Sequence, residues 1–337
     1  MSNTKQVQTP VFIPLGVADP KGTTGYVFIH PGTLRAISLD LGKILWSRVS
    51  VSKPLIVYKD LLVGLRLLSA DTNSFQIDLM ESNENGTITL SSEIIRFPGW
   101  VNTDEKSNSF SMDVFLNGDH LILKWKARQL YRGGAPPPSH IEQLNSKQDQ
   151  GIFQVDLING KVKPLSNEIR NNLSMEGLTD PGNNLSVIST WENMNYYYAL
   201  LSGVSEENVT YYLMSWDHSF KALHSPAFLT EGKAVVPYLS KDKNYLFFHQ
   251  EKVSDENDKC LWSIFSASTA KQEGKVSIEQ RAQYPCMINS RLIYLLDLQK
   301  GPEIETLLKC MDINENKLLW ELQISERPYT RPFALRQ

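Results

Sequence analysis

Apolar and polar positions alternate along this chain in short runs, and they do not follow a helical spacing. No long window places apolar side chains convincingly at i, i+3, i+4 and i+7. Short runs rich in β-branched and aromatic residues appear instead, separated by turn residues, as in Leu292–Leu296. This pattern is typical of an all-β sandwich, barrel or propeller. We therefore expect an all-β fold.

A repeated phrase favours the propeller among these architectures. Near the N-terminus a strand leads through Asp40 and the turn residues Gly42-Lys43 to a second strand that ends at Trp46. Near the C-terminus the phrase returns around Asp312 and ends at Trp320. The carboxylate can accept hydrogen bonds from turn amides, and glycine permits positive φ in a tight hairpin. We place the turn position of the six copies at Asp40, Asp78, Asp156, Asp217, Ser266 and Asp312.

Two more strand-like runs precede each later copy, which makes four strands per repeat. We predict a single propeller domain over residues 1–337 with about six four-stranded blades. The long step from Asp78 to Asp156 leaves seven blades possible. We prefer a loop insertion at about 128–150, because this stretch contains paired glycines and three consecutive prolines.

The ends of the chain are expected to close the propeller together. Tyr329 to Leu335 resembles the first strand of a further blade, and Pro10–Pro14 with Tyr26–Ile29 could complete it. Pairing of N- and C-terminal strands would remove exposed sheet edges, which is the purpose of closing a propeller.

The phrase from Ala36 to Trp46 resembles the repeat of the pyrroloquinoline-quinone-type β-propellers. Only the copies at Asp40 and Asp312 are close to it, and the resemblance implies a fold more than a function. WD and kelch repeats fit less well, since the Trp-Asp and Gly-Gly dipeptides each occur once. Quinone-dependent members of this fold type are eight-bladed and carry an adjacent cysteine pair with a calcium ligand set. This chain is too short, and its three cysteines are not adjacent. We therefore expect no cofactor and no metal.

Composition narrows the classes of function. The chain is 41% hydrophobic and 21% charged with a formal net charge of −3, and it lacks a basic strip of the kind that nucleic-acid binders use. Its longest apolar runs are of strand length, so we expect a soluble, cytoplasmic protein without nucleic-acid or membrane partners. Phosphate-loop, dinucleotide-binding, zinc-protease and nucleophile-elbow motifs are missing from the sequence.

A propeller usually binds at one mouth of its central channel, where the insertion and the segments between blades would meet. Aromatic and arginine side chains there suit anionic or planar ligands. The candidate ligand-binding residues are Tyr131, Arg132, His140, Trp100, Arg281 and Arg331. Our first hypothesis is a propeller that binds a protein, peptide or small molecule. The alternatives are a propeller enzyme, such as a lyase, cyclase or hydrolase, and a sensor or assembly subunit. Whether the chain is catalytic stays open at this point.

Overall fold

The computed structural model describes residues 7–29, 32–68, 71–101, 108–129, 148–165, 185–192, 196–205, 208–217, 226–250, 259–300 and 303–328. Every regular element in these ranges is a β-strand. The same ranges hold no helix that is long and apolar enough to cross a membrane. The chain divides into an N-terminal unit, residues 1–11 and 15–170, and a C-terminal unit, residues 12–14 and 171–337.

Three antiparallel sheets belong to the N-terminal unit, except that Phe12 and Ile13 of the first sheet are grouped with the C-terminal unit. Their orders are β2-β3-β4-β5-β6, β10-β9-β8-β7 with β11 beside β9, and β1-β12-β13-β14-β15. The strands of the first sheet are β2 (Val11–Ile13), β3 (Gly16–Ala18), β4 (Thr24–Ile29), β5 (Thr33–Ser38) and β6 (Lys43–Val49). Those of the second are β7 (Ser52–Tyr58), β8 (Leu61–Leu68), β9 (Asp71–Glu81), β10 (Ile88–Ser91) and β11 (Ile95–Arg96). Those of the third are β1 (Val7–Gln8), β12 (Asn108–Asn117), β13 (His120–Gln129), β14 (Gln148–Asp156) and β15 (Val162–Leu165).

The C-terminal unit contains three sheets of four strands each, and the strands of each sheet follow one another in the chain. The fourth sheet has β16 (Ser186–Glu192), β17 (Tyr197–Ser205), β18 (Asn208–Trp216) and β19 (Ala227–Gly232). The fifth has β20 (Val235–Leu239), β21 (Tyr245–Gln250), β22 (Lys259–Ser266) and β23 (Gln272–Glu279). The sixth has β24 (Gln283–Ile288), β25 (Arg291–Lys300), β26 (Glu303–Asp312) and β27 (Lys317–Pro328).

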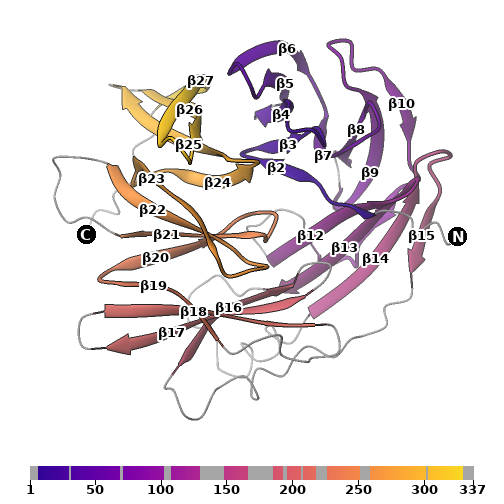
Figure 1. The fold of residues 1–337 in the computed structure, drawn as a ribbon. Coiled ribbons are helices and arrows are strands. Elements are labelled where there is room, and N and C mark those ends of the chain that lie inside the picture. Colours follow the sequence, from indigo (N-terminus) through magenta and orange to yellow (C-terminus); the bar gives the residue numbers. More distant parts are fainter. Residues whose placement is uncertain are drawn as a thin grey trace, which may run out of the picture. The chain divides into compact units, whose positions relative to one another are not determined.

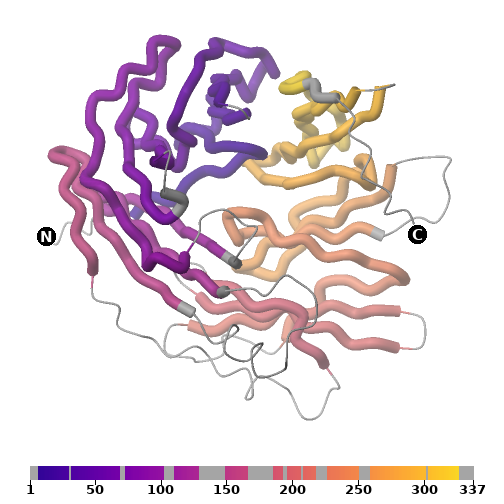
Figure 2. Tube along the Cα trace, turned by 180° about the vertical axis from the view of Figure 1, so that it is seen from behind, coloured from indigo at the N-terminus to yellow at the C-terminus, as the bar shows by residue number. Residues whose placement is uncertain are grey.

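Figure 1 shows these sheets as successive groups of arrows from indigo to yellow, and Figure 2 shows from behind that each group is a short meander. The described residues form six consecutive antiparallel sheets, each built on a four-stranded meander, and β2, β11 and β1 add one short strand to the first, second and third sheets. Four-stranded meanders of this kind are the repeating unit of a β-propeller. The predicted all-β propeller with six four-stranded blades is thereby confirmed.

The predicted turn position falls at the end of the third strand in three sheets. Asp156 ends β14 and accepts a hydrogen bond from the Ile158 amide, and Asp312 ends β26 and accepts from the Asn314 amide, each at 2.8 Å. Ser266 ends β22, and its carbonyl accepts from the Ala270 amide at 2.9 Å. In each hairpin a lysine follows five residues after the strand-end residue. The sequence repeat is therefore a hairpin signal.

Two of the predicted turn positions need correction. In the first sheet the strand-end residue is Ser38, which accepts from the Leu41 amide at 3.3 Å, while Asp40 lies within the turn. In the second sheet Asp78 does not close a strand, because β9 continues to Glu81. The turn there is built around Asn83, whose side-chain oxygen accepts from the Gly86 amide at 3.0 Å. Asp78 is instead a buried strand residue.

Two predictions concern segments that are only partly described. Of the proposed insertion at about 128–150, the ends belong to β13 and β14, and residues 130–147 lie outside the described residues. For closure, β4 pairs with β3 on one edge and β5 on the other, so Tyr26–Ile29 lies in an inner strand of the first sheet. Residues 329–337 lie outside the described residues, and pairing of the termini stays a prediction.

The largest core cluster of the N-terminal unit packs the second sheet against the third. Alternate residues of β9, including Phe75, Ile77 and Leu79, lie on this face and are buried with Trp125 of β13. Successive strand side chains point to opposite faces. Gln76 and Asp78 therefore lie on the other face of the second sheet, beside the segment that arrives from the first sheet.

Candidate functional site: an apolar surface on a pinned linker

The short connection between the first and second sheets carries unusually exposed apolar side chains. Val49 ends β6 and is 87% exposed, and Val51 precedes β7 and is 66% exposed. Ser52 of β7 pairs with Arg66 of β8, so Val51, which precedes β7, and Leu67 of β8 are the next residues outward along the two strands. Leu67 is 55% exposed. We call Val49, Val51 and Leu67 the linker surface.

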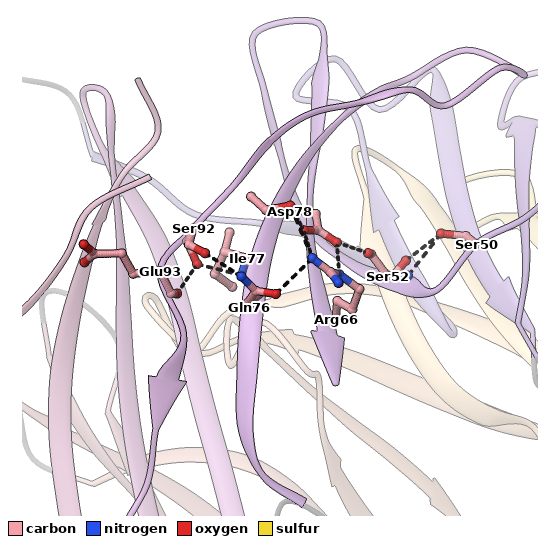
Figure 3. Close-up of polar contacts among 9 residues, drawn as sticks. Ser50, Ser52, Arg66, Gln76, Ile77, Asp78, Ser92 and Glu93 are labelled. Carbon is pink, nitrogen blue, oxygen red and sulfur yellow. Dashed lines mark hydrogen bonds and ion pairs between the residues drawn. The ribbon is translucent and has the colours of Figure 1, made fainter. Parts of the chain in front are cut away.

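The backbone under the linker surface is held by serine side chains. The Ser50 amide donates to the Gly32 carbonyl at 2.8 Å. The Ser50 hydroxyl donates to the Ser52 carbonyl at 3.0 Å and accepts from the Ser52 amide at 3.3 Å (Figure 3). Serine is suited to this place because its hydroxyl both donates and accepts over a short reach. The connection is therefore ordered although its apolar side chains face water.

Asp78 anchors this connection to the second sheet. Its side chain is fully buried, and its Oδ2 accepts from the Ser52 hydroxyl at 2.5 Å. The same carboxylate pairs with Arg66, whose Nε lies 2.8 Å from Oδ2 and whose Nη2 lies 3.1 Å from Oδ1. The Ser91 hydroxyl donates to Oδ1 at 2.7 Å. A buried charge is tolerated only when it is paired and hydrogen-bonded in this way.

The pKa of Asp78 follows from two opposed causes. Burial raises the pKa, but the hydrogen bonds from the guanidinium and the two hydroxyls outweigh it and hold the pKa below its ordinary value of 3.8. The hydrogen bonds to Asp78 raise the pKa of Arg66 above its ordinary value. Both groups therefore keep their charges across the neutral range, and this pair is unsuited to proton transfer there.

The polar network continues across the second sheet. Arg66 Nη2 donates to the Gln76 side chain at 3.0 Å, and Gln76 Nε2 donates to the Ser92 carbonyl at 2.8 Å (Figure 3). Gly64 gives room for this arrangement, since a Cβ there would lie 2.7 Å from the Met80 side chain and 3.0 Å from Ser52 Cβ. The backbone that carries the linker surface is thus held by a continuous hydrogen-bond network across the second sheet.

The residues predicted to bind a ligand stand as follows. Trp100 follows the second sheet and is half-buried against the core cluster of the N-terminal unit. Arg281 lies exposed in the turn before β24 of the C-terminal unit. The remaining four, Tyr131, Arg132, His140 and Arg331, lie outside the described residues. The predicted site at the channel mouth stays a prediction.

Sequence reasoning missed the role of Asp78, although a signal was present. The run from Phe75 to Leu79 alternates strictly between apolar and polar residues. That alternation places Gln76 and Asp78 on one face of a continuing strand. Reading Asp78 as a turn residue required the strand to stop there. The alternation was the better guide.

Comparison with known proteins adds the following. No protein-family model and no curated protein sequence matches the chain. Among solved structures, the apo AtxE2 isopeptidase has a TM-score of 0.43 and 12% identity, over 94% of this chain and 52% of that one. BamB from Moraxella catarrhalis has a TM-score of 0.33 and 10% identity, over 82% and 77%. A europium-containing methanol dehydrogenase has a TM-score of 0.37 and 8% identity, over 95% and 79%.

The chain spans about half the length of the isopeptidase structures that it matches. At these TM-scores the likenesses carry no inference about what the chain binds or transforms.

Proposed function

We propose that this chain is a binding protein that recognises a protein or peptide partner through the linker surface. The observation that carries the proposal is the exposure of Val49, Val51 and Leu67 on a backbone that hydrogen bonds hold in place. Apolar side chains gathered at one place mark interaction surfaces. A surface that is ordered before binding loses little conformational freedom when the partner arrives.

The partner would bury apolar side chains against the linker surface. Complete burial of one valine or leucine side chain contributes about 1.5–3 kcal/mol. A tenfold change in affinity corresponds to about 1.4 kcal/mol. Replacing one of these side chains with a charge should therefore weaken binding at least tenfold.

The test begins with short random peptides that are displayed and selected on the full chain. Titration calorimetry then compares the wild type with Val51→Asp and Leu67→Asp. The matched controls are Leu41→Asp and Ile158→Asp, because both positions are exposed apolar residues in hairpin turns, at 64% and 70%. We expect the selected peptides to lose affinity at least tenfold with the first pair only. Equal affinity for all four variants, or equal loss with the controls, would contradict the proposal.

A further inference from the structure

The dipeptide Asn-Gly occurs three times in the chain, at Asn85, Asn117 and Asn159. All three lie at hairpins of the N-terminal unit, and the glycine that follows each has a positive φ, from 59° to 74°. Asparagine before glycine is prone to deamidate, because glycine has no side chain to shield its own amide nitrogen. The fold then decides which of the three asparagines can react.

Deamidation at such a site needs only water as a second reactant. The glycine amide nitrogen attacks Cγ of the asparagine and gives up its proton, and the side-chain nitrogen leaves as ammonia. Water then opens the five-membered imide at one of its two carbonyls, which gives aspartate or isoaspartate. The asparagine side chain must therefore be able to turn onto the next residue, and the glycine amide must be able to leave its hydrogen bond.

Asn159 is held by hydrogen bonds at both ends of its side-chain amide. Its Nδ2 donates to Asp156 Oδ2 at 2.8 Å, and its Oδ1 accepts from the Lys161 amide at 2.9 Å. The amide of Gly160, which would be the attacking group, donates to the Asp156 carbonyl at 2.8 Å. Attack at Asn159 requires that all three bonds break.

Asn117 is held through its backbone. It ends β12, where it pairs with His120 of β13 on one side and with Val7 of β1 on the other. Strands on both edges fix its backbone in an extended conformation. Turning its side chain onto Gly118 requires a backbone rotation that would disturb both pairings.

Asn85 has neither restraint. It lies between β9 and β10, in the turn built around Asn83, and its side chain is exposed. Among the described residues this side chain makes no hydrogen bond. The Gly86 amide donates to the side-chain oxygen of Asn83, which is itself exposed, at 3.0 Å. The reacting groups can therefore meet through a local opening that breaks no strand pair.

The same turn is where the first sheet holds the second. Arg48 of β6 donates through Nη1 to the carbonyl of Glu81 at 3.2 Å and to the carbonyl of Asn83. Gly86 passes so close to the guanidinium that a Cβ there would lie 1.7 Å from Nη1. Isoaspartate at position 85 would add one methylene to the backbone just before Gly86. The turn would then no longer fit under Arg48.

We propose that Asn85 is a site of spontaneous deamidation and that its isoaspartate form loosens the contact between the first and second sheets. Asn117 and Asn159 share the dipeptide but are protected by the fold. The proposal does not depend on a partner at the linker surface.

Peptide mapping by mass spectrometry tests the site on the full chain, incubated at neutral pH either folded or unfolded in urea. A methyltransferase specific for isoaspartate identifies the product. In the folded chain we expect Asn85 to deamidate at least about tenfold faster than the other two, because each of them must first break several hydrogen bonds. In urea the three rates should converge. An unmodified Asn85, similar rates in the folded chain, or the same order of rates in urea would overturn the proposal.

Two variants test the cause of the difference. Asp156→Ala removes two of the acceptors' side-chain atoms at the third hairpin and should raise the rate at Asn159 while that at Asn85 stays unchanged. Asn83→Ala frees the Gly86 amide and should raise the rate at Asn85 alone. Circular dichroism checks that each variant is folded. No change at the expected asparagine in either folded variant would overturn the assignment of protection to these hydrogen bonds.

The structural consequence is tested on the isoaspartate form, separated by ion exchange. Its matched control is Asn85→Asp, which carries the same charge on a backbone of normal length. We expect the isoaspartate form to unfold at a lower urea concentration than Asn85→Asp. Equal midpoints would show that the longer backbone does not loosen the contact with Arg48, and would overturn that part of the proposal.

Discussion

Removing the charge of Asp78 tests the base of the linker surface most directly. Asp78→Asn keeps the size of the side chain and one acceptor oxygen, but it places an amide where Arg66 and Ser52 donate. At least two of the four hydrogen bonds to the carboxylate are lost, and the guanidinium loses its partner. Breaking a buried ion pair by changing one partner costs about 3–5 kcal/mol. Arg66 is 28% exposed and regains some hydration, so we expect about 3 kcal/mol.

The assay is urea unfolding of wild type and variant, followed by tryptophan fluorescence across a range of pH. The folded-state pKa of Asp78 lies below its unfolded value near 3.8, so its contribution is complete above that value and is lost as pH falls through the folded pKa. We expect a constant gap in unfolding free energy from pH 5 to 8 that closes only in strong acid. Hydrogen exchange at Ser50 and Ser52 should accelerate in the variant, because their anchor is weakened.

Two results would refute this reasoning. A gap below about 1 kcal/mol at pH 7 would mean that the network contributes little beyond an exposed ion pair. A gap that persists unchanged into strong acid would mean that the charge of Asp78 is not its source.

Three further predictions concern other parts of the molecule. Gly16→Ala should lower the urea midpoint strongly, because a Cβ there lies 1.8 Å from a carbonyl oxygen of β4, whereas Gly99→Ala meets no atom within 4 Å and should shift it little. Lys309 Nζ lies 2.9 Å from Glu279 of the fifth sheet, so Lys309→Met should cost about 3 kcal/mol at pH 7, and Glu279→Leu in the same chain should recover much of it. Because pairing raises the pKa of Lys309, this cost should disappear as pH rises through that pKa, and a constant cost in alkali would contradict the pairing. Burial raises the pKa of Cys286 to about 12, so Ellman's reagent at pH 8 should label this thiol only as the chain unfolds, and prompt labelling of the folded chain would refute this.

The fold could be predicted from the sequence because the same turn residues recur in its hairpins. The strand-end residue and the lysine five positions later recur as Asp156 with Lys161 and as Asp312 with Lys317, and each pair lies within a few residues along the chain. The conformation of such a short hairpin is determined by the residues of its own turn. Between the second and third sheets the described residues form no further sheet, and the insertion at about 128–150 stays a prediction because most of it lies outside them.

The candidate site and the ion pair of Lys309 could not be predicted in this way. They form only when strands pair in register and neighbouring sheets come into contact. Asp78 pairs with Gly64, and Lys309 pairs with Tyr294, each three residues before the end of its third strand. The two charged residues thus hold the same register position, yet their side chains differ in sign and size. A repeat search that aligns residue types passes over such a position. Only the partners on neighbouring strands and sheets reveal what each charge does.

The assignment of Phe12–Pro14 to the C-terminal unit has a consequence for how the chain can be divided. The ribosome synthesises these residues near the start of the chain, but they are grouped with sheets that are synthesised more than a hundred and fifty residues later. Ile13 is completely buried, and Lys241 lies 4.7 Å from the centre of the Phe12 ring. A gene cut between the units would therefore give a C-terminal fragment that lacks part of its own core. During synthesis, this early segment reaches its final environment only when the last sheets have emerged.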